Sequence, residues 1–271
     1  MNSQEVENAY YGAVNYLKPY MTYDACKKIS ILDKSMDPDR PFDFVLYLER
    51  SLIRYKKIFN SELKLNTKWL EVGALFPALP ITLSMLGFRV TVVEEFGFYP
   101  REIRDLYDEI SQRYSVVFLN KNVTSTPKVG LGGDYEYVSL MGVIEHLPHT
   151  PRLLLENIHS NMKQGGTLFV DVPNLYFAAT IIRFLKGKHI QPPIETIYDS
   201  GIPYVGHHRE YSIPDLRYVL GKSGFGIKRL ELFNYSFDYS RRDIHKLWAL
   251  PMAIAQFRPL RETIFTECIR L

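Results

Sequence analysis

Acidic side chains close two apolar runs in the first half of the chain, where they could bind the hydroxyl groups of a ligand. One run ends in Glu71 and Gly73, and the β-branched run 89–93 ends at Glu94 and Glu95. In an open α/β sheet, ligands bind outside the carboxyl ends of the strands, and an acid after the second strand can hold both ribose hydroxyls of an adenosine. The pattern predicts a pocket for an adenosine-containing ligand. Strand alternation favours Glu94 as the ribose ligand, and a solvated strand end is the alternative.

The turn after the first of these runs has few glycines. Only Gly73 is present, and Leu75 and Pro77 stand where further glycines would be expected. A dinucleotide fold needs GxGxxG so that the backbone can approach a pyrophosphate, and a GxxxxGK[ST] phosphate loop is absent from the sequence as well. A cofactor without phosphates makes no such demand on the turn. S-adenosylmethionine is one, whereas a nicotinamide dinucleotide is disfavoured.

Several histidines are placed where they could move a proton. Glu145 and His146 directly follow an apolar run, and His207 and His208 precede Arg209. Because an imidazole titrates near neutral pH, a histidine beside a cleft can act as a general base. We expect His146, His207 or Glu145 to take part in catalysis, and His208 and Arg209 to contact the substrate. The alternative is structural, with Glu145 and His146 capping the next helix.

A helix start follows the second histidine pair. Ser212 and Asp215 have the spacing of a capping box, and Pro214 lies in the first turn. This pattern satisfies the free amides at a helix N-terminus. Part of the segment is therefore explained by local structure alone.

Two longer segments carry a family resemblance. Residues 135–147, YEYVSLMGVIEHL, and residues 206–225, GHHREYSIPDLRYVLGKSGF, resemble the V-[IL]-E-H-L and H-x-R-E-[FY]-[ST] segments of class I S-adenosylmethionine-dependent methyltransferases. Glu71 and Gly73 are similar to the first motif of that family. The resemblance implies an α/β, Rossmann-like fold with S-adenosylmethionine as the cofactor. The cofactor contacts that it implies are Glu71 and Gly73 on the methionine moiety, Glu94 on the ribose, Asn122 and Val123 at the adenine edge, and Met141 in the loop that closes the pocket.

Strands and helices alternate along the chain, which predicts a mostly parallel sheet with helices on both faces. By resemblance, the last strand would insert antiparallel. A turn is expected at Gly165 and Gly166. Further elements are expected as helices at 41–60, 100–114 and 151–162 and as strands at 115–119, 137–141, 167–172, 226–236 and 263–271.

The predicted organisation is a helical N-terminal extension, residues 1–64, packed on a methyltransferase domain, residues 65–271, with insertions at about 173–205 and 237–262. The first insertion could be a lid that offers Tyr176 and Tyr204 to the substrate, with Phe177 and Tyr198 completing an aromatic wall. A helix packed on the core is the alternative, and Arg183, Lys186 and Lys188 leave membrane-surface binding as a lesser one. For the second insertion, the alternatives are a dimer contact, an acceptor pocket and ordinary packing. A homodimer is therefore one of the predicted assemblies.

Composition narrows the class of protein. The 271 residues carry a formal net charge of +3 without a Lys/Arg block, so nucleic acid is not expected as a partner. No apolar stretch approaches twenty residues and no charged leader precedes one, so we expect a cytoplasmic protein. Cys26 and Cys268 lack a CxxC pair or a nearby His cluster, so neither a disulfide nor a metal site is expected.

The sequence therefore predicts S-adenosylmethionine-dependent methylation, with O-methylation of a sugar, glycan precursor or secondary metabolite as the leading hypothesis. One alternative is a non-catalytic relative that keeps the fold for binding, as the few glycines suggest. Another is a methyltransferase acting on a lipid-linked acceptor. A nicotinamide-dependent oxidoreductase is the weakest of the hypotheses, because GxGxxG is absent.

Overall fold

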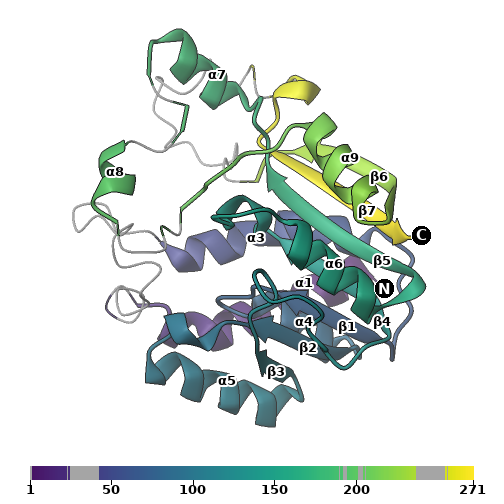
Figure 1. Ribbon diagram of the computed structural model, residues 1–271. Coiled ribbons are helices and arrows are strands. Elements are labelled where there is room, and N and C mark those ends of the chain that lie inside the picture. Colours follow the sequence, from purple (N-terminus) through teal and green to yellow (C-terminus); the bar gives the residue numbers. More distant parts are fainter. Residues whose placement is uncertain are drawn as a thin grey trace.

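Alternating apolar runs build a seven-stranded sheet in the order β3-β2-β1-β4-β5-β7-β6. The computed structural model describes residues 2–22, 24, 43–188, 190–191, 194–200, 204, 206–235, 254 and 256–271. Figure 1 shows the sheet crossing the molecule between layers of helices. The strands are β1 (Lys68–Val72), β2 (Arg89–Glu94), β3 (Val117–Asn120), β4 (Tyr135–Met141), β5 (Met162–Pro173), β6 (Phe225–Phe233) and β7 (Thr263–Arg270).

The first five strands pair in parallel, and β7 inserts antiparallel between β5 and β6. The predicted Rossmann-like α/β fold and the antiparallel last strand are thus confirmed. The turn predicted at Gly165 and Gly166 is wrong, because both glycines lie inside β5. There the pairing with β4 shifts register. A Cβ on Gly166 would lie 2.9 Å from the Lys163 carbonyl oxygen, so Gly166 allows the backbone to approach itself closely at this irregularity in the strand.

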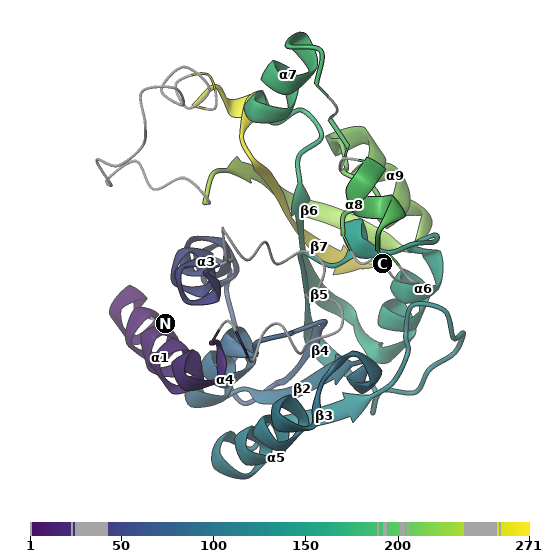
Figure 2. The same cartoon turned by 90° about the vertical axis from the view of Figure 1, so that its left-hand side faces the viewer.

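Helices cover both faces of the sheet (Figure 2). Buried side chains of α1, α3, α4 and α5 form one core with Trp69 and Phe169, whose rings stack 5.6 Å apart. Buried side chains of α6 and α9 form a second core on the other face. The bounds are α1 (Ser3–Leu17), α3 (Phe44–Phe59), α4 (Ala78–Met85), α5 (Arg101–Tyr114), α6 (Arg152–Asn161) and α9 (Ile213–Lys222).

The amphipathic helix predicted at 41–60 is confirmed as α3. Asp43 caps it, and its buried residues recur along one face, as an apolar stripe at helical spacing requires. The helix is anchored to the sheet at two places. Near its middle, Arg54 pairs with Asp171 of β5.

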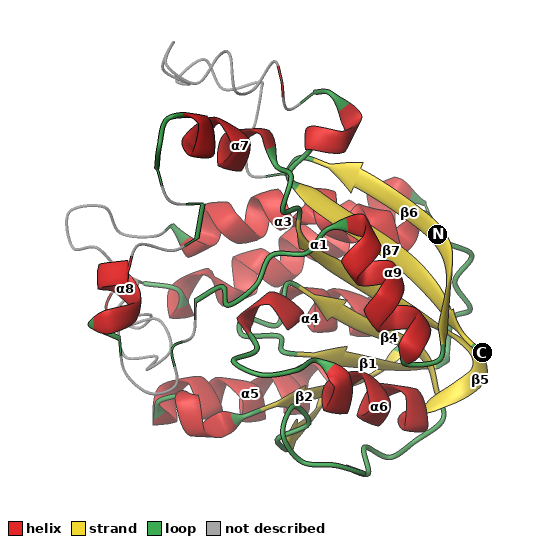
Figure 3. Cartoon of the chain, turned by 45° about the horizontal axis from the view of Figure 1, so that its top comes forward, coloured by secondary structure: helices red, strands yellow, loops and turns green. Residues whose placement is uncertain are grey.

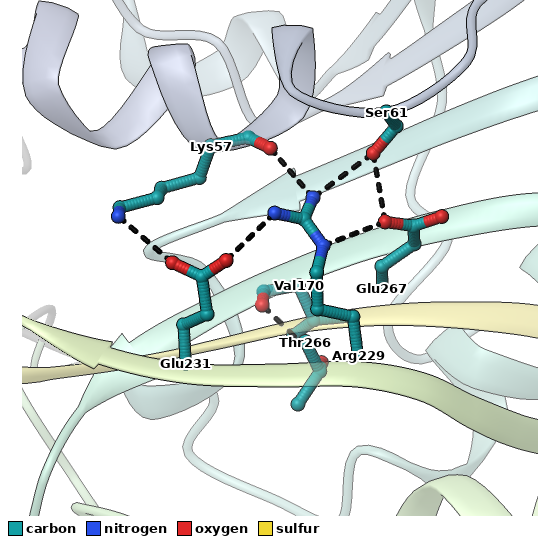
Figure 4. Close-up of polar contacts among 7 residues, drawn as sticks. All are labelled: Lys57, Ser61, Val170, Arg229, Glu231, Thr266 and Glu267. Carbon is teal, nitrogen blue, oxygen red and sulfur yellow. Dashed lines mark hydrogen bonds and ion pairs between the residues drawn. The ribbon is translucent and has the colours of Figure 1, made fainter.

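Near the end of α3, Arg229 of β6 holds a second anchor (Figure 4). Its guanidinium donates to the Lys57 carbonyl at 2.7 Å and to Oγ of Ser61 at 2.9 Å. It also pairs with Glu231 and Glu267, at 2.8 and 2.9 Å. One half-buried arginine therefore joins α3 to the two antiparallel strands.

The chain after β5 departs from the layered core. Helices α7 (Ala178–Leu185) and α8 (Ile194–Tyr198) project beyond the layers that cover the sheet (Figure 3). Both lie in the first predicted insertion. Most of the second, 237–262, is outside the described residues, so the dimer contact considered there stays a prediction.

Candidate active site

A cavity of about 650 Å³ opens at the carboxyl ends of β1, β2, β3 and β4. We call it the first cavity. It collects residues that follow four different strands, as the parallel order of the sheet requires. Its walls include Gly73, Leu75, Glu94, Glu95, Phe98, Tyr99, Lys121, Asn122, Val123, Thr124, Ser125, Gly142, Val143, His146, Leu147, Pro148, His149 and Tyr204.

The turn after β1 keeps a glycine-like path with a single glycine. Gly73 has φ +71°, and a Cβ there would lie 3.1 Å from a methyl of Val143. Leu75 also has a positive φ, 48°, in a region that L-residues seldom adopt. Tyr107 donates to the Leu75 carbonyl at 2.7 Å, and the Leu75 amide donates to Glu94 at 3.2 Å. Tertiary contacts thus hold the backbone where further glycines were expected.

Glu94 is the last residue of β2 and faces the first cavity. Its carboxylate accepts from the amides of Leu75 and Glu95, at 3.2 and 3.1 Å. Burial raises the pKa of Glu94, while these amides act in the opposite direction. The neighbouring Glu95 instead accepts from the side-chain amide of Asn122 at 3.1 Å. The carboxylate of Glu95 therefore pairs with the side chain of Asn122, whereas the carboxylate of Glu94 is held by backbone amides.

Asn122 and Val123 both line the first cavity, and their contact with the adenine edge stays a prediction. The side-chain oxygen of Asn122 accepts from the amides of Thr124 and Ser125, at 3.0 and 2.9 Å. The Asn122 side chain thus stabilises the loop after β3, and residues of that loop form part of the wall of the first cavity.

Glu145, His146 and His207 lie together, although the last is distant in sequence. One ligand atom from each lies within 4.8 Å of the others. The two imidazole rings are 4.7 Å apart and meet edge to face. The carbonyl of Glu145 accepts from the amides of His208, at 2.7 Å, and Arg209, at 3.3 Å. These backbone bonds bring the two sequence segments to one place.

The cluster is electrostatically unusual. Glu145 is only 2% exposed, and burial raises its pKa to about 7. Burial lowers the pKa of His207, but the nearby carboxylates of Glu210 and Glu145 outweigh that effect and raise it. The pKa values of Glu145 and His207 are therefore both raised, and perturbed pKa values of this kind are common in sites that exchange protons.

A second cavity, of about 690 Å³, shares the wall formed by residues 147–149 with the first. His207, His208 and Arg209 line it, together with Leu175, Arg183, Ile190, Gln191 and Glu210. His208 contacts the carbonyl of Tyr204 at 2.7 Å through Nε2. Arg209 pairs with Asp215 at 3.3 Å. The predicted capping box of Ser212 and Asp215 is confirmed directly after this segment.

The methyltransferase-domain family matches residues 44–229, which is more than half of the chain. The chain belongs to this family. No curated protein matches it significantly. The match begins in α3, so it includes part of the predicted N-terminal extension.

Solved structures of methyltransferases have the same fold. One is the methyltransferase in complex with the Haloferax volcanii Trm112 activator, at 11% identity and a TM-score of 0.59, covering 92% of this chain and 97% of that one. Another is magnesium protoporphyrin IX methyltransferase from Synechocystis PCC 6803 with bound SAH, at 14% identity and a TM-score of 0.56, covering 95% of this chain and 99% of that one. A third is an S-adenosylmethionine-dependent methyltransferase from Mesorhizobium loti, at 12% identity and a TM-score of 0.57, covering 83% of this chain and 100% of that one. The chain is a class I methyltransferase by family and fold, and neighbours with this fold bind S-adenosylmethionine or SAH.

The first cavity fits this cofactor. Glu94 offers a carboxylate at the end of β2, where an adenosine ribose binds in such sheets. Gly73 leaves space that a Cβ would fill against Val143. The cavity volume is in the range of small-molecule sites. When bound, S-adenosylmethionine supplies a methyl group that its sulfonium already activates.

Four predicted site residues, Glu145 among them, lie outside the walls of both cavities. Glu71 is 3% exposed and accepts a hydrogen bond from the Ser139 hydroxyl, and burial raises its pKa to about 8. Met141 belongs to the core beneath the site. Tyr176 is 52% exposed. Their predicted contacts with cofactor or substrate stay predictions, whereas Tyr204 does line the first cavity.

Sequence reasoning missed other residues at the site. His149 belongs to none of the motifs, yet it lines both cavities. Lys121, Thr124 and Ser125 could have been found, because they follow β3 as Asn122 does. Arg54 had no such signal. It reaches the site from α3, and its Nη2 lies 2.8 Å from where a Cβ of Gly142 would stand.

Proposed function

We propose that this methyltransferase methylates a hydroxyl group of a small acceptor, such as a sugar, a glycan precursor or a secondary metabolite, and that the acceptor binds in the second cavity. The observation that carries the proposal is the shared wall of residues 147–149 between the two cavities. His146 lines one cavity and His207 the other, and their rings are in contact. A methyl donor in the first cavity and an acceptor in the second would therefore meet beside this pair.

The work of the protein is to orient the acceptor hydroxyl, exclude water and remove its proton. Orientation alone can contribute about 7–11 kcal/mol in favourable cases, and a general base about 10²–10⁴-fold. Glu145, His146 and His207 lie close enough together to share the removal of that proton. His208 and Arg209 are the proposed substrate contacts, because they line the second cavity.

Asp171 is a poor candidate for the base. It is fully buried, and both of its carboxylate oxygens accept hydrogen bonds from Arg54, at 2.8 and 2.6 Å. A carboxylate held in this way stabilises the packing of α3 on β5. We therefore assign the proton transfer to Glu145, His146 and His207.

The test is methyl transfer from S-adenosylmethionine with a deuterated methyl group to a panel of sugar nucleotides, glycans and phenolic metabolites. Mass spectrometry would detect a labelled acceptor, and fragmentation would show whether oxygen carries the methyl group. Label found on nitrogen or carbon would contradict O-methylation. Calorimetry with SAH, run in parallel, separates the alternatives, because a non-catalytic relative would bind SAH without turnover on any acceptor of the panel.

A lipid-linked acceptor is the second candidate, and the exposed end of α7 favours it. Phe184 and Leu185 are 65% and 76% exposed and lie between the exposed cations Arg183 and Lys186. Apolar and basic side chains combined in this way suit an anionic membrane surface. Arg183 also lines the second cavity, so such a surface would lie next to the proposed acceptor site. No helix among the described residues is long and apolar enough to cross a bilayer.

Co-sedimentation with phosphatidylglycerol vesicles tests this candidate. Binding should fall when salt is raised and when Phe184 and Leu185 are both replaced by Ser. Tyr218, which is 66% exposed on α9, provides the matched control, Tyr218→Ser. Equal binding of all three proteins, or none at low salt, would leave the soluble acceptor as the surviving proposal.

A further inference from the structure

Glu145, His146 and His207 offer one oxygen and two nitrogen atoms that all lie within 4.8 Å of one another. We call these three residues the ligand cluster. The arrangement is built by the fold rather than by a loose surface. Glu145 and His146 lie in a short turn of 3₁₀ helix, Ile144–His146, directly after β4. The amides of His208 and Arg209 hold His207 beside that turn through the carbonyl of Glu145.

The carboxylate of Glu145 provides a second, independent observation. Its Oε2 atom is buried and has no hydrogen-bond partner among the described residues, and the whole residue is only 2% exposed. A buried carboxylate without a partner is costly, and such groups in proteins are paired, hydrogen-bonded or bound to a metal. A cation beside Oε2 would provide the missing partner.

We propose that the ligand cluster binds one divalent first-row transition-metal cation, such as Mn²⁺, Co²⁺ or Zn²⁺. Two imidazoles and one carboxylate are the ligands that these ions prefer, whereas Mg²⁺ and Ca²⁺ prefer oxygen alone. Ligands bonded at about 2.0–2.2 Å to one ion lie no more than about 4.4 Å apart. Small side-chain rotations would close the cluster to that size.

The surroundings of His207 agree with a ligating role. Oε1 of Glu210 lies 3.9 Å from its Nδ1. A carboxylate next to a ligating imidazole is the usual outer partner, since it orients the ring and makes the other nitrogen a better ligand. Three protein ligands also leave open positions, as in metal sites that bind substrate.

The position of the cluster gives the ion a chemical role, and this part rests on the proposed function. His146 lines the first cavity and His207 the second, so an ion between them would face both. An acceptor hydroxyl bound to it would have a lowered pKa and would release its proton to solvent water, and its oxygen would take the methyl group while SAH leaves as the neutral thioether. A histidine nitrogen that holds a metal cannot also accept a proton, so the ion would replace the histidine base. No metal site was expected from the spacing of the two cysteines, whereas Glu145, His146 and His207 are brought together only by the fold.

The test is calorimetric titration of the full chain, freed of metal with EDTA, by MnCl₂, CoCl₂, ZnCl₂ and MgCl₂ in turn, without S-adenosylmethionine. The parent should bind one equivalent of at least one of the first three ions more tightly than Mg²⁺. Glu145→Gln and His207→Asn should each weaken that binding by about 100-fold or more, since loss of an outer partner alone costs about 10–100-fold. His149→Asn removes a histidine from both cavity walls but not from the cluster, and it should bind as the parent does.

A further readout on the parent covers the case in which a variant does not fold. Co²⁺ bound through imidazole gives a visible absorption spectrum that the free ion lacks, and a bound ion should raise the midpoint of thermal unfolding with its concentration. No saturable binding by the parent would overturn the proposal, and so would unchanged binding by His207→Asn. Because no methyl transfer is measured, these outcomes are independent of whether the proposed O-methylation is correct.

Discussion

Arg54 and Asp171 make the most informative target for substitution, because they join α3 to β5 through a buried ion pair. Arg54 is 3% exposed and Asp171 is fully buried. The guanidinium donates from Nε and Nη2 to the two carboxylate oxygens, at 2.8 and 2.6 Å. It also donates to the Tyr47 hydroxyl at 2.8 Å and lies 5.0 Å from the centre of the Tyr235 ring.

Arg54→Met keeps most of the side-chain volume but leaves the Asp171 carboxylate buried without a cation. Two charge-assisted hydrogen bonds to Asp171 are lost, at about 1.5–3 kcal/mol each, together with the one to Tyr47, and removal of one partner from a buried pair typically costs about 3–5 kcal/mol. We therefore expect the free energy of unfolding to fall by about 3–5 kcal/mol. Asp171→Asn should destabilise for the same reason, because it leaves the guanidinium without its counter-charge.

The double variant distinguishes an ion pair from two separate packing effects. With both charges removed, as in Arg54→Met with Asp171→Asn, no buried charge is left unpaired, so the cost should be less than the sum of the single costs. Urea unfolding followed by circular dichroism measures all four proteins. Arg152→Met, which removes an exposed ion pair on α6, is the control and should leave the midpoint nearly unchanged.

Additive costs in the double variant would refute this reasoning. So would an Arg54→Met protein within about 1 kcal/mol of the parent, since that is the range of an exposed pair. SAH affinity provides a second readout. Because Arg54 lies against Gly142 in the wall of the first cavity, Arg54→Met should also weaken SAH binding.

Three further predictions concern the cofactor, pH and the second anchor of α3. Glu94→Ala should weaken SAH binding in calorimetry by about 1–3 kcal/mol, the range of charge-assisted hydrogen bonds, and by more than Glu95→Ala does; an unchanged affinity in a folded protein would remove Glu94 from the ribose site. Burial raises the pKa of Glu71 from 4.5 to about 8, so the folded state holds a proton that the unfolded state has lost, and the unfolding free energy should fall as pH rises from about 4.5 to 8. Glu71→Gln should flatten that slope in urea titrations at several pH values, and an unaltered slope would contradict the assignment. Arg229→Gln should lower the unfolding free energy by about 1–3 kcal/mol, because it removes hydrogen bonds to α3 and to two carboxylates. Arg217→Gln, on the exposed face of α9, is the control and should not lower it. Equal urea midpoints for the two variants would show that the Arg229 network does not contribute to stability.

Much of the candidate site could be predicted because its signals are local. An acid at the end of a β-branched run lies at the edge of the sheet wherever that strand is parallel to its neighbours, which is how Glu94 was found. The loop after β3 follows from the same rule and accounts for Asn122 and Val123. The capping box of Ser212 and Asp215 depends only on residues three apart.

The family motifs predicted both halves of the ligand cluster but not their contact. Residues 145 and 207 meet because β5, α7 and α8 return the chain to the same edge of the sheet, where backbone hydrogen bonds to Glu145 fasten it. Such a return depends on how the intervening elements pack, and no spacing in the sequence encodes it.

The sequence by itself determined the alternating elements, the parallel sheet and the acid after β2, because periodicity and strand ends act over a few neighbouring residues, and its family resemblance implied the cofactor class. Only the tertiary structure decided which polar groups are buried together. Arg54 meets Asp171, 117 positions away, and Leu75 keeps a glycine-like turn because Tyr107 and Glu94 hold it. The partner of a buried charge is set by the packing of whole helices on the sheet, and its energy depends on the exclusion of water there, so both exist only in the folded chain.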